Sequence, residues 1–168
     1  MESWKKGLTG LLIITLAGCA YSPFGSADKA DMVTIENYKY KNDDVTEVAQ
    51  LMCFKRHIAP YQESARSLPP TKHKIYIRSV DYNNFGNDIL ISRGGGQMMS
   101  STYLLLEAVL QPGQHVAIKR HDENDLTYLW LQDLDSGKPV SEVKATKMLS
   151  NFNVSERIYD KQCAKGTV

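Results

Sequence analysis

The short spacing between apolar runs is the feature that most constrains the fold of this chain. Runs rich in β-branched and aromatic residues occupy 75–80, 103–110, 115–121 and 126–131. The connections between them include tight turns such as Pro112-Gly113, which are too short to hold the helical crossover that joins two parallel strands. The sequence therefore predicts a mainly β or α+β fold, in the form of a small antiparallel β-sandwich-like domain with one or two short helices.

Two segments have the apolar spacing of a helix. In the first, Asp44 and Glu47 form a capping-box-like pair. Apolar residues then follow at helical spacing, namely Val45, Val48, Ala49, Met52 and Cys53. The second segment spans 154–163, where Val154 and Ile158 lie one turn apart. We expect a helix from Asp44 that places Cys53 on its inward face, and a short final helix.

The two most apolar runs, 103–110 and 126–131, carry apolar residues at nearly every position. This pattern predicts strands that are covered on both faces. A short strand is also expected at 89–91, before Gly94-Gly95-Gly96. Six aromatic residues gather in the strand region, namely Tyr76, Tyr82, Phe85, Tyr103, Tyr128 and Trp130. We expect most of them in the core, and any that remain exposed would provide a surface for a partner.

The beginning of the chain has the pattern of an export signal. Lys5 and Lys6 precede an apolar stretch at 8–17, and Ala17 and Gly18 stand before a cysteine. The stretch is shorter than the roughly 20 residues that span a bilayer. The alternative is a buried N-terminal helix or an uncleaved anchor. Such a helix would be apolar on every side and would need complete burial.

The tetrapeptide Leu16-Ala17-Gly18-Cys19 resembles the lipobox of bacterial lipoproteins. The resemblance implies that signal peptidase II removes residues 1–18 and that Cys19 carries a lipid anchor in the membrane. Ala20 follows the cysteine, which in enteric lipoproteins accompanies export to the outer membrane, so we expect the outer membrane in preference to the inner membrane. Residues 19–30 would then be a flexible tether, and residues 31–168 a single periplasmic domain.

Cys53 and Cys163 are the two cysteines that remain once Cys19 is assigned to the anchor. In the oxidising compartment that the leader implies, we expect them to form a disulfide. Such a bridge would stabilise the fold by about 4–5 kcal/mol in the chain-entropy model. The alternative is two buried, reduced thiols. The chain has no Cys-x-x-Cys motif, so a structural role is favoured over a redox role.

The charge of the chain is balanced, with 20 Lys and Arg against 19 Asp and Glu. Removing the leader with Glu2, Lys5 and Lys6 leaves equal numbers of the two signs. There is thus no basic excess of the kind that binds nucleic acid, and we expect no nucleic-acid partner.

The polar residues form no recognised catalytic or metal-binding arrangement. His115 and His121 would share a strand face but lie about 20 Å apart, too far to bind one metal ion. Gly94-Gly95-Gly96 lacks the lysine of a phosphate-binding loop. Asp122, Glu123 and Asp125 lack the spacing of a calcium loop and are interpreted as a solvated turn. We therefore predict no catalytic residue, no metal and no cofactor, in a protein that is not an enzyme.

A second resemblance covers residues 75–119. The run Ile75-Tyr76-Ile77-Arg78 and the run from Leu110 to His115 resemble a family of small β-rich bacterial lipoproteins whose domain has no assigned function. The Pro-Gly-x-His turn also resembles turns of transthyretin-like and carboxypeptidase-regulatory sandwiches. This likeness implies a fold and says nothing of an activity.

These observations favour an outer-membrane lipoprotein with a periplasm-facing β-rich domain. We expect it to act as an adaptor or accessory subunit of an assembly with other envelope proteins. The alternative is an inhibitor or binder of a periplasmic enzyme or cell-wall ligand that works through one loop.

Overall fold

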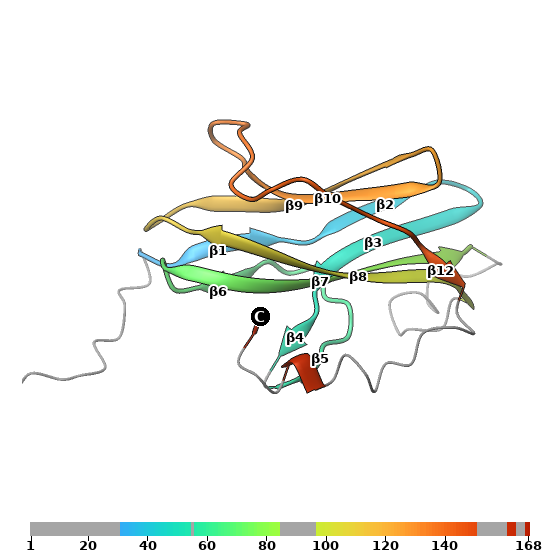
Figure 1. The fold of residues 1–168 in the computed structure, drawn as a ribbon, viewed down its shortest axis with the longest axis horizontal. Coiled ribbons are helices and arrows are strands. Elements are labelled where there is room, and N and C mark those ends of the chain that lie inside the picture. The colour runs from blue at the N-terminus through green and yellow to red at the C-terminus, as the bar shows by residue number, and fades with distance from the viewer. Residues whose placement is uncertain (1–30, 55, 85–96, 151–160, 164–166) are drawn as a thin grey trace, which may run out of the picture.

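The computed structural model describes residues 31–54, 56–84, 97–150, 161–163 and 167–168. In this part of the chain two five-stranded sheets stack as two layers (Figure 1). The predicted class is confirmed, because the fold is mainly β and mostly antiparallel. Cys19, the signal sequence, the tether and the predicted strand at 89–91 lie outside the described residues, as does Gly94-Gly95-Gly96.

Each sheet contains both long and short strands. The first sheet has the order β11 (Lys144–Thr146), β10 (Leu126–Asp133), β9 (His115–Glu123), β1 (Val33–Glu36) and β6 (Arg66–Leu68). The second has the order β12 (Leu149–Ser150), β8 (Gln97–Val109), β7 (Lys72–Asn83), β3 (Val45–Leu51) and β2 (Tyr38–Lys41). A separate hairpin consists of β4 (Cys53–Phe54) and β5 (His57–Ile58).

Among the described strands, the pair β1–β9 is parallel, and every other pair is antiparallel. In that pair Thr34 lies opposite His115. No helical crossover is needed for this arrangement, because the chain between β1 and β9 builds most of the second sheet.

The main core lies between the two sheets. It follows from strand alternation, because every second residue of a strand points to the same face. Val33 and Ile35 of β1 meet residues of the facing sheet such as Ile75 and Ile77 of β7, and all four are fully buried. In β10 the alternation is strict, and the inward residues include Leu129 and Leu131.

The predicted helix from Asp44 to Cys53 is wrong, since this segment forms β3 and the first strand of the β4–β5 hairpin. β3 is paired on both sides, with β2 and with β7. It buries consecutive residues on both of its faces, including Val48, Ala49 and Gln50. The ladder hydrogen bonds and the two buried faces outweigh the local capping signal, which contributes only about 1 kcal/mol.

Three predictions about buried faces and aromatic residues are also wrong. The run 126–131 forms β10, which fully buries only alternate residues and so is not covered on both faces. β8 has the two-residue β12 as its outer neighbour, and its Val109 is 59% exposed. None of the aromatic residues at 76, 82, 103, 128 and 130 is fully buried, because they lie at strand positions outside the main core. Tyr76 and Tyr103 instead pack on a smaller cluster around the disulfide. Phe85 lies outside the described residues.

Lys161–Cys163 forms a single helical turn, which agrees with the end of the helix predicted over 154–163. The remainder of that predicted helix lies outside the described residues. Among the described residues no helix is long and apolar enough to cross a membrane.

Candidate functional site

The predicted disulfide is present. Cys53, at the start of β4, is bonded to Cys163 in the C-terminal helical turn, with 5.3 Å between the two Cα atoms. Both cysteines are almost fully buried, together with Met52. The bridge lies on the face of the second sheet that points away from the first, where Figure 1 shows β4, β5 and the C-terminus below β7 and β8.

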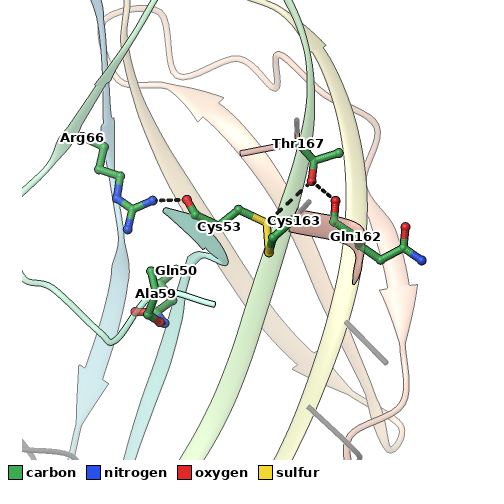
Figure 2. Close-up of a disulfide and its surroundings, with 7 residues drawn as sticks. All are labelled: Gln50, Cys53, Ala59, Arg66, Gln162, Cys163 and Thr167. Atoms are coloured by element: carbon green, nitrogen blue, oxygen red, sulfur yellow. Dashed lines mark hydrogen bonds between the residues drawn. A yellow bond between two sulfur atoms is a disulfide. The ribbon is translucent and has the colours of Figure 1, made fainter. Parts of the chain in front are cut away.

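Several contacts fix the surroundings of the bridge (Figure 2). The Arg66 guanidinium donates to the carbonyl of Cys53. Burial lowers the pKa of Arg66 from its usual value. The guanidinium also lies over the Phe54 ring, 5.1 Å from the ring centroid. The Thr167 hydroxyl donates to the carbonyl of Gln162 over 2.8 Å and lies 3.6 Å from Cys53 Sγ. The hairpin and the C-terminal residues are thereby held together.

A second group of polar residues surrounds Arg120, whose side chain is 3% exposed although it lies on β9. Its guanidinium donates to Asp81 Oδ1 over 2.6 Å and to the Ser79 hydroxyl over 3.1 Å. It also binds Asp122 over 2.9 Å. Ser79 and Asp81 belong to the second sheet and Arg120 to the first, so the guanidinium joins the two layers.

The partners of Arg120 are themselves held in place. Ser100 donates to Asp81 over 2.8 Å, and Thr127 donates to Asp122 over 2.5 Å. Glu47 of β3 lies 3.9 Å from the guanidinium and accepts a hydrogen bond from the Tyr38 hydroxyl over 3.2 Å. Three carboxylates therefore surround one buried cation.

This environment changes the pKa of Glu47 and of Tyr38. Burial is the largest cause that raises the pKa of Glu47, and the charge of Arg120 opposes it. Burial, together with the neighbouring Glu47 carboxylate, raises the pKa of Tyr38 to about 12. Tyr38 is therefore a neutral hydrogen-bond donor at physiological pH.

A cavity of about 600 Å³ lies beside Arg120. Its carboxylates are Glu47, Asp81, Asp122, Glu123 and Asp125. Met99, Leu126 and Met148 provide apolar walls. Asn124 and Asp125 have positive φ angles of 52° and 61°, which is the geometry of a two-residue hairpin turn between β9 and β10.

The acidic turn at 122–125 is only partly the solvated turn that the sequence suggests. Glu123 and Asp125 are exposed in the turn, but Asp122 is engaged by Arg120 and Thr127. Sequence reasoning missed Arg120 altogether. The one local signal is an arginine in the middle of an alternating strand, and this signal does not identify partners on β3 and β7.

The histidines do not converge. His115 Nε2 lies 2.7 Å from Glu36, and His73 Nε2 lies 2.8 Å from the carbonyl of Pro69. His121 lies near the Tyr128 ring. In the described part of the chain, no group of three or more His, Cys, Asp or Glu residues is placed to hold a metal ion.

A surface hollow of about 540 Å³ lies at the end of β8. Val109, Pro139 and Val140 line it, beside an ion pair of 2.9 Å between Lys72 and Glu107. Val109 and nearby Val143 are the two most exposed of the large apolar residues described, at 59% and 53%. The hollow is thus lined by apolar and charged side chains together.

Comparison with known proteins gives no relative for this chain: no protein family, no curated protein and no solved structure matches it.

Proposed function

We propose that this protein is an outer-membrane lipoprotein whose periplasmic sandwich domain acts as an adaptor in an assembly of envelope proteins. The observation that carries the proposal is the lipobox-like tetrapeptide Leu16-Ala17-Gly18-Cys19, which stands ahead of a β-rich domain. A disulfide between Cys53 and Cys163 supports an oxidising compartment such as the periplasm.

The surface of the domain supports a role in binding a protein. Val109 and Val143 are each more than half exposed, and exposed apolar residues beside a polar rim are typical of contact sites. The rim here includes the Lys72–Glu107 ion pair. We propose this surface as the site where the adaptor contacts its partner.

Photo-crosslinking in intact cells tests the adaptor role. A photoreactive amino acid placed at Val143 should yield a covalent product with another envelope protein, whereas the same amino acid at exposed Asp43, in the turn before β3, should not. If neither position captures a protein, the adaptor role is wrong. Capture of a periplasmic enzyme whose activity then falls would favour the alternative of an inhibitor.

The anchor is tested separately. Cys19→Ser should abolish incorporation of labelled palmitate and leave residues 1–18 attached, while Cys163→Ala should incorporate label like the parent. The labelled parent should sediment with outer-membrane vesicles in a density gradient. Normal processing and labelling of Cys19→Ser would refute the lipoprotein assignment, and sedimentation with inner-membrane vesicles would refute the outer-membrane location.

A further inference from the structure

Val168 occupies a strand position beside β7. Its amide donates to the carbonyl of Lys74 over 3.2 Å, and its carbonyl accepts from the amide of Tyr76 over 2.6 Å. These two bonds have the pattern of a parallel strand pairing centred on Ile75. Val168 also packs against the main core cluster, of which Ile75 is a member. This agrees with the pairing, because residues that lie opposite each other on neighbouring strands point to the same side of a sheet.

This position is open to another segment because β3 does not extend along β7 as far as the N-terminal end of β7 at Lys72. β3 pairs with β7 as far as Leu51, opposite Ile77. The amide of Met52 then donates to the carbonyl of Tyr76 over 2.8 Å, and the chain turns away into β4. The edge of β7 at Ile75 is thus left for another segment.

Met52 also limits which segment fits. A chain that runs beside β7 in the direction of Val168 reaches the place of Met52 one residue later. The position therefore suits an extended residue at which a segment ends or turns away, and does not suit the middle of a long strand.

We propose that this edge of β7 is a docking site for a short extended segment of a partner protein that carries a branched apolar residue, and that Val168 is its intramolecular occupant. Main-chain hydrogen bonds to Lys74 and Tyr76 hold such a segment, as in other cases of strand addition. The core beside Ile75 selects an apolar side chain. This inference rests on the proposed adaptor function and names the partner class.

The intramolecular occupant is tethered close to its site. Cys163 is bonded to Cys53, and Thr167 contacts both Gln162 and the disulfide sulfur of Cys53. A tether of this kind gives the bound segment an effective concentration in the millimolar range. An external peptide must displace it, so removal of the occupant should strengthen peptide binding.

Peptide binding to the purified lipoprotein in detergent tests the proposal. The probe is a fluorescent peptide with the sequence of residues 161–168 that carries Cys163→Ser, and binding is followed by fluorescence anisotropy. A variant that lacks Thr167 and Val168 should bind this peptide at least about tenfold more tightly than the parent. A control peptide in which Asp replaces the last valine should not bind.

The shortened variant must keep its disulfide, checked by gel mobility, and must unfold cooperatively. If it does so and binds the peptide no better than the parent, the proposal is overturned; equal binding of the two peptides also overturns it. If the shortened variant does not fold, Val168→Gly is judged by the same criteria. The assay contains no envelope partner, so its failure is distinct from failure of the crosslinking that tests the adaptor role.

Discussion

Arg120 is a cation removed from water and compensated by carboxylates of both sheets. Its hydrogen bonds and charge pairing with Asp81 and Asp122 raise its pKa, although its burial opposes this effect. The contribution of Arg120 to the free energy of unfolding depends on those partners, because removing one member of a buried ion pair leaves the other charge uncompensated and strongly destabilises the fold.

Replacement of Arg120 by Met should lower the free energy of unfolding by about 3 kcal/mol, because Asp81 is left without its cation. Urea denaturation measures the change. Lys119→Met, at the next position of β9, is the matched control and should change stability by less than about 0.5 kcal/mol. Equal effects of the two substitutions would contradict the role assigned to Arg120.

The raised pKa of Glu47 predicts that the stability of the protein depends on pH. Its pKa is raised above the ordinary value of 4.5 in the folded protein, so the folded state holds this proton more tightly than the unfolded state. The contribution of Glu47 is most favourable below pH 4.5 and is lost as the pH rises through the raised pKa. Glu47→Gln should therefore match the parent at low pH and be more stable at pH 7. Urea titrations across this range check the prediction, and a difference between the two proteins that does not vary with pH would contradict it.

At the residue scale, the sequence revealed the disulfide pair and did not reveal the Arg120 network. The cysteines could be paired by elimination, since the lipobox-like motif accounts for the third. Arg120 gave no such signal, because its contact with Asp81 spans 39 positions of the chain. Long-range polar contacts depend on strand register, which local spacing does not determine.

At the scale of elements, the segment from Val45 to Cys53 shows where the spacing of apolar residues fails to distinguish a helix from a strand. Its apolar residues fit a helix of 3.6 residues per turn, but they equally fit a strand that is buried on both faces. Val45, Thr46 and Val48 are β-branched and favour the strand. In contrast, the apolar runs at 115–121 and 126–131 and the tight turn at Pro112-Gly113 were sufficient to predict the strands β9 and β10, although the alternating burial of β10 was not predicted.

The disulfide joins a hairpin near the beginning of the domain to its C-terminal turn across 110 positions. Closing so long a loop restricts the unfolded chain, so the double variant Cys53→Ala Cys163→Ala should lose about 2–5 kcal/mol of stability. Denaturation in urea measures the loss. The parent, once its disulfide is reduced, should have the same free energy of unfolding as the double variant. A parent whose stability and gel mobility do not respond to reductant would contradict the bridge.

At the scale of the whole molecule, the two sheets share one core and should unfold together. Ile77 of the second sheet and Leu129 of the first are both fully buried in it. Ile77→Ala and Leu129→Ala should each cost about 2–5 kcal/mol and shift a single transition. Trp130 fluorescence reports on the first sheet and circular dichroism on both. Two separate transitions would show that the layers are independent.

The parallel pair β1–β9 has a consequence for the order of folding. β1 comes first along the described chain, yet its neighbour on one side is β9, with Thr34 opposite His115. Pairings between such distant segments form slowly because a long loop must close first. If the chain enters the periplasm from its N-terminus, β1 can pair with β6, as Val33 does with Leu68, but it must wait for its neighbour on the other side until β9 has emerged. Chaperones that hold exported chains would meet this domain during that interval, and slowing the delivery of β9 should prolong its exposure to proteases.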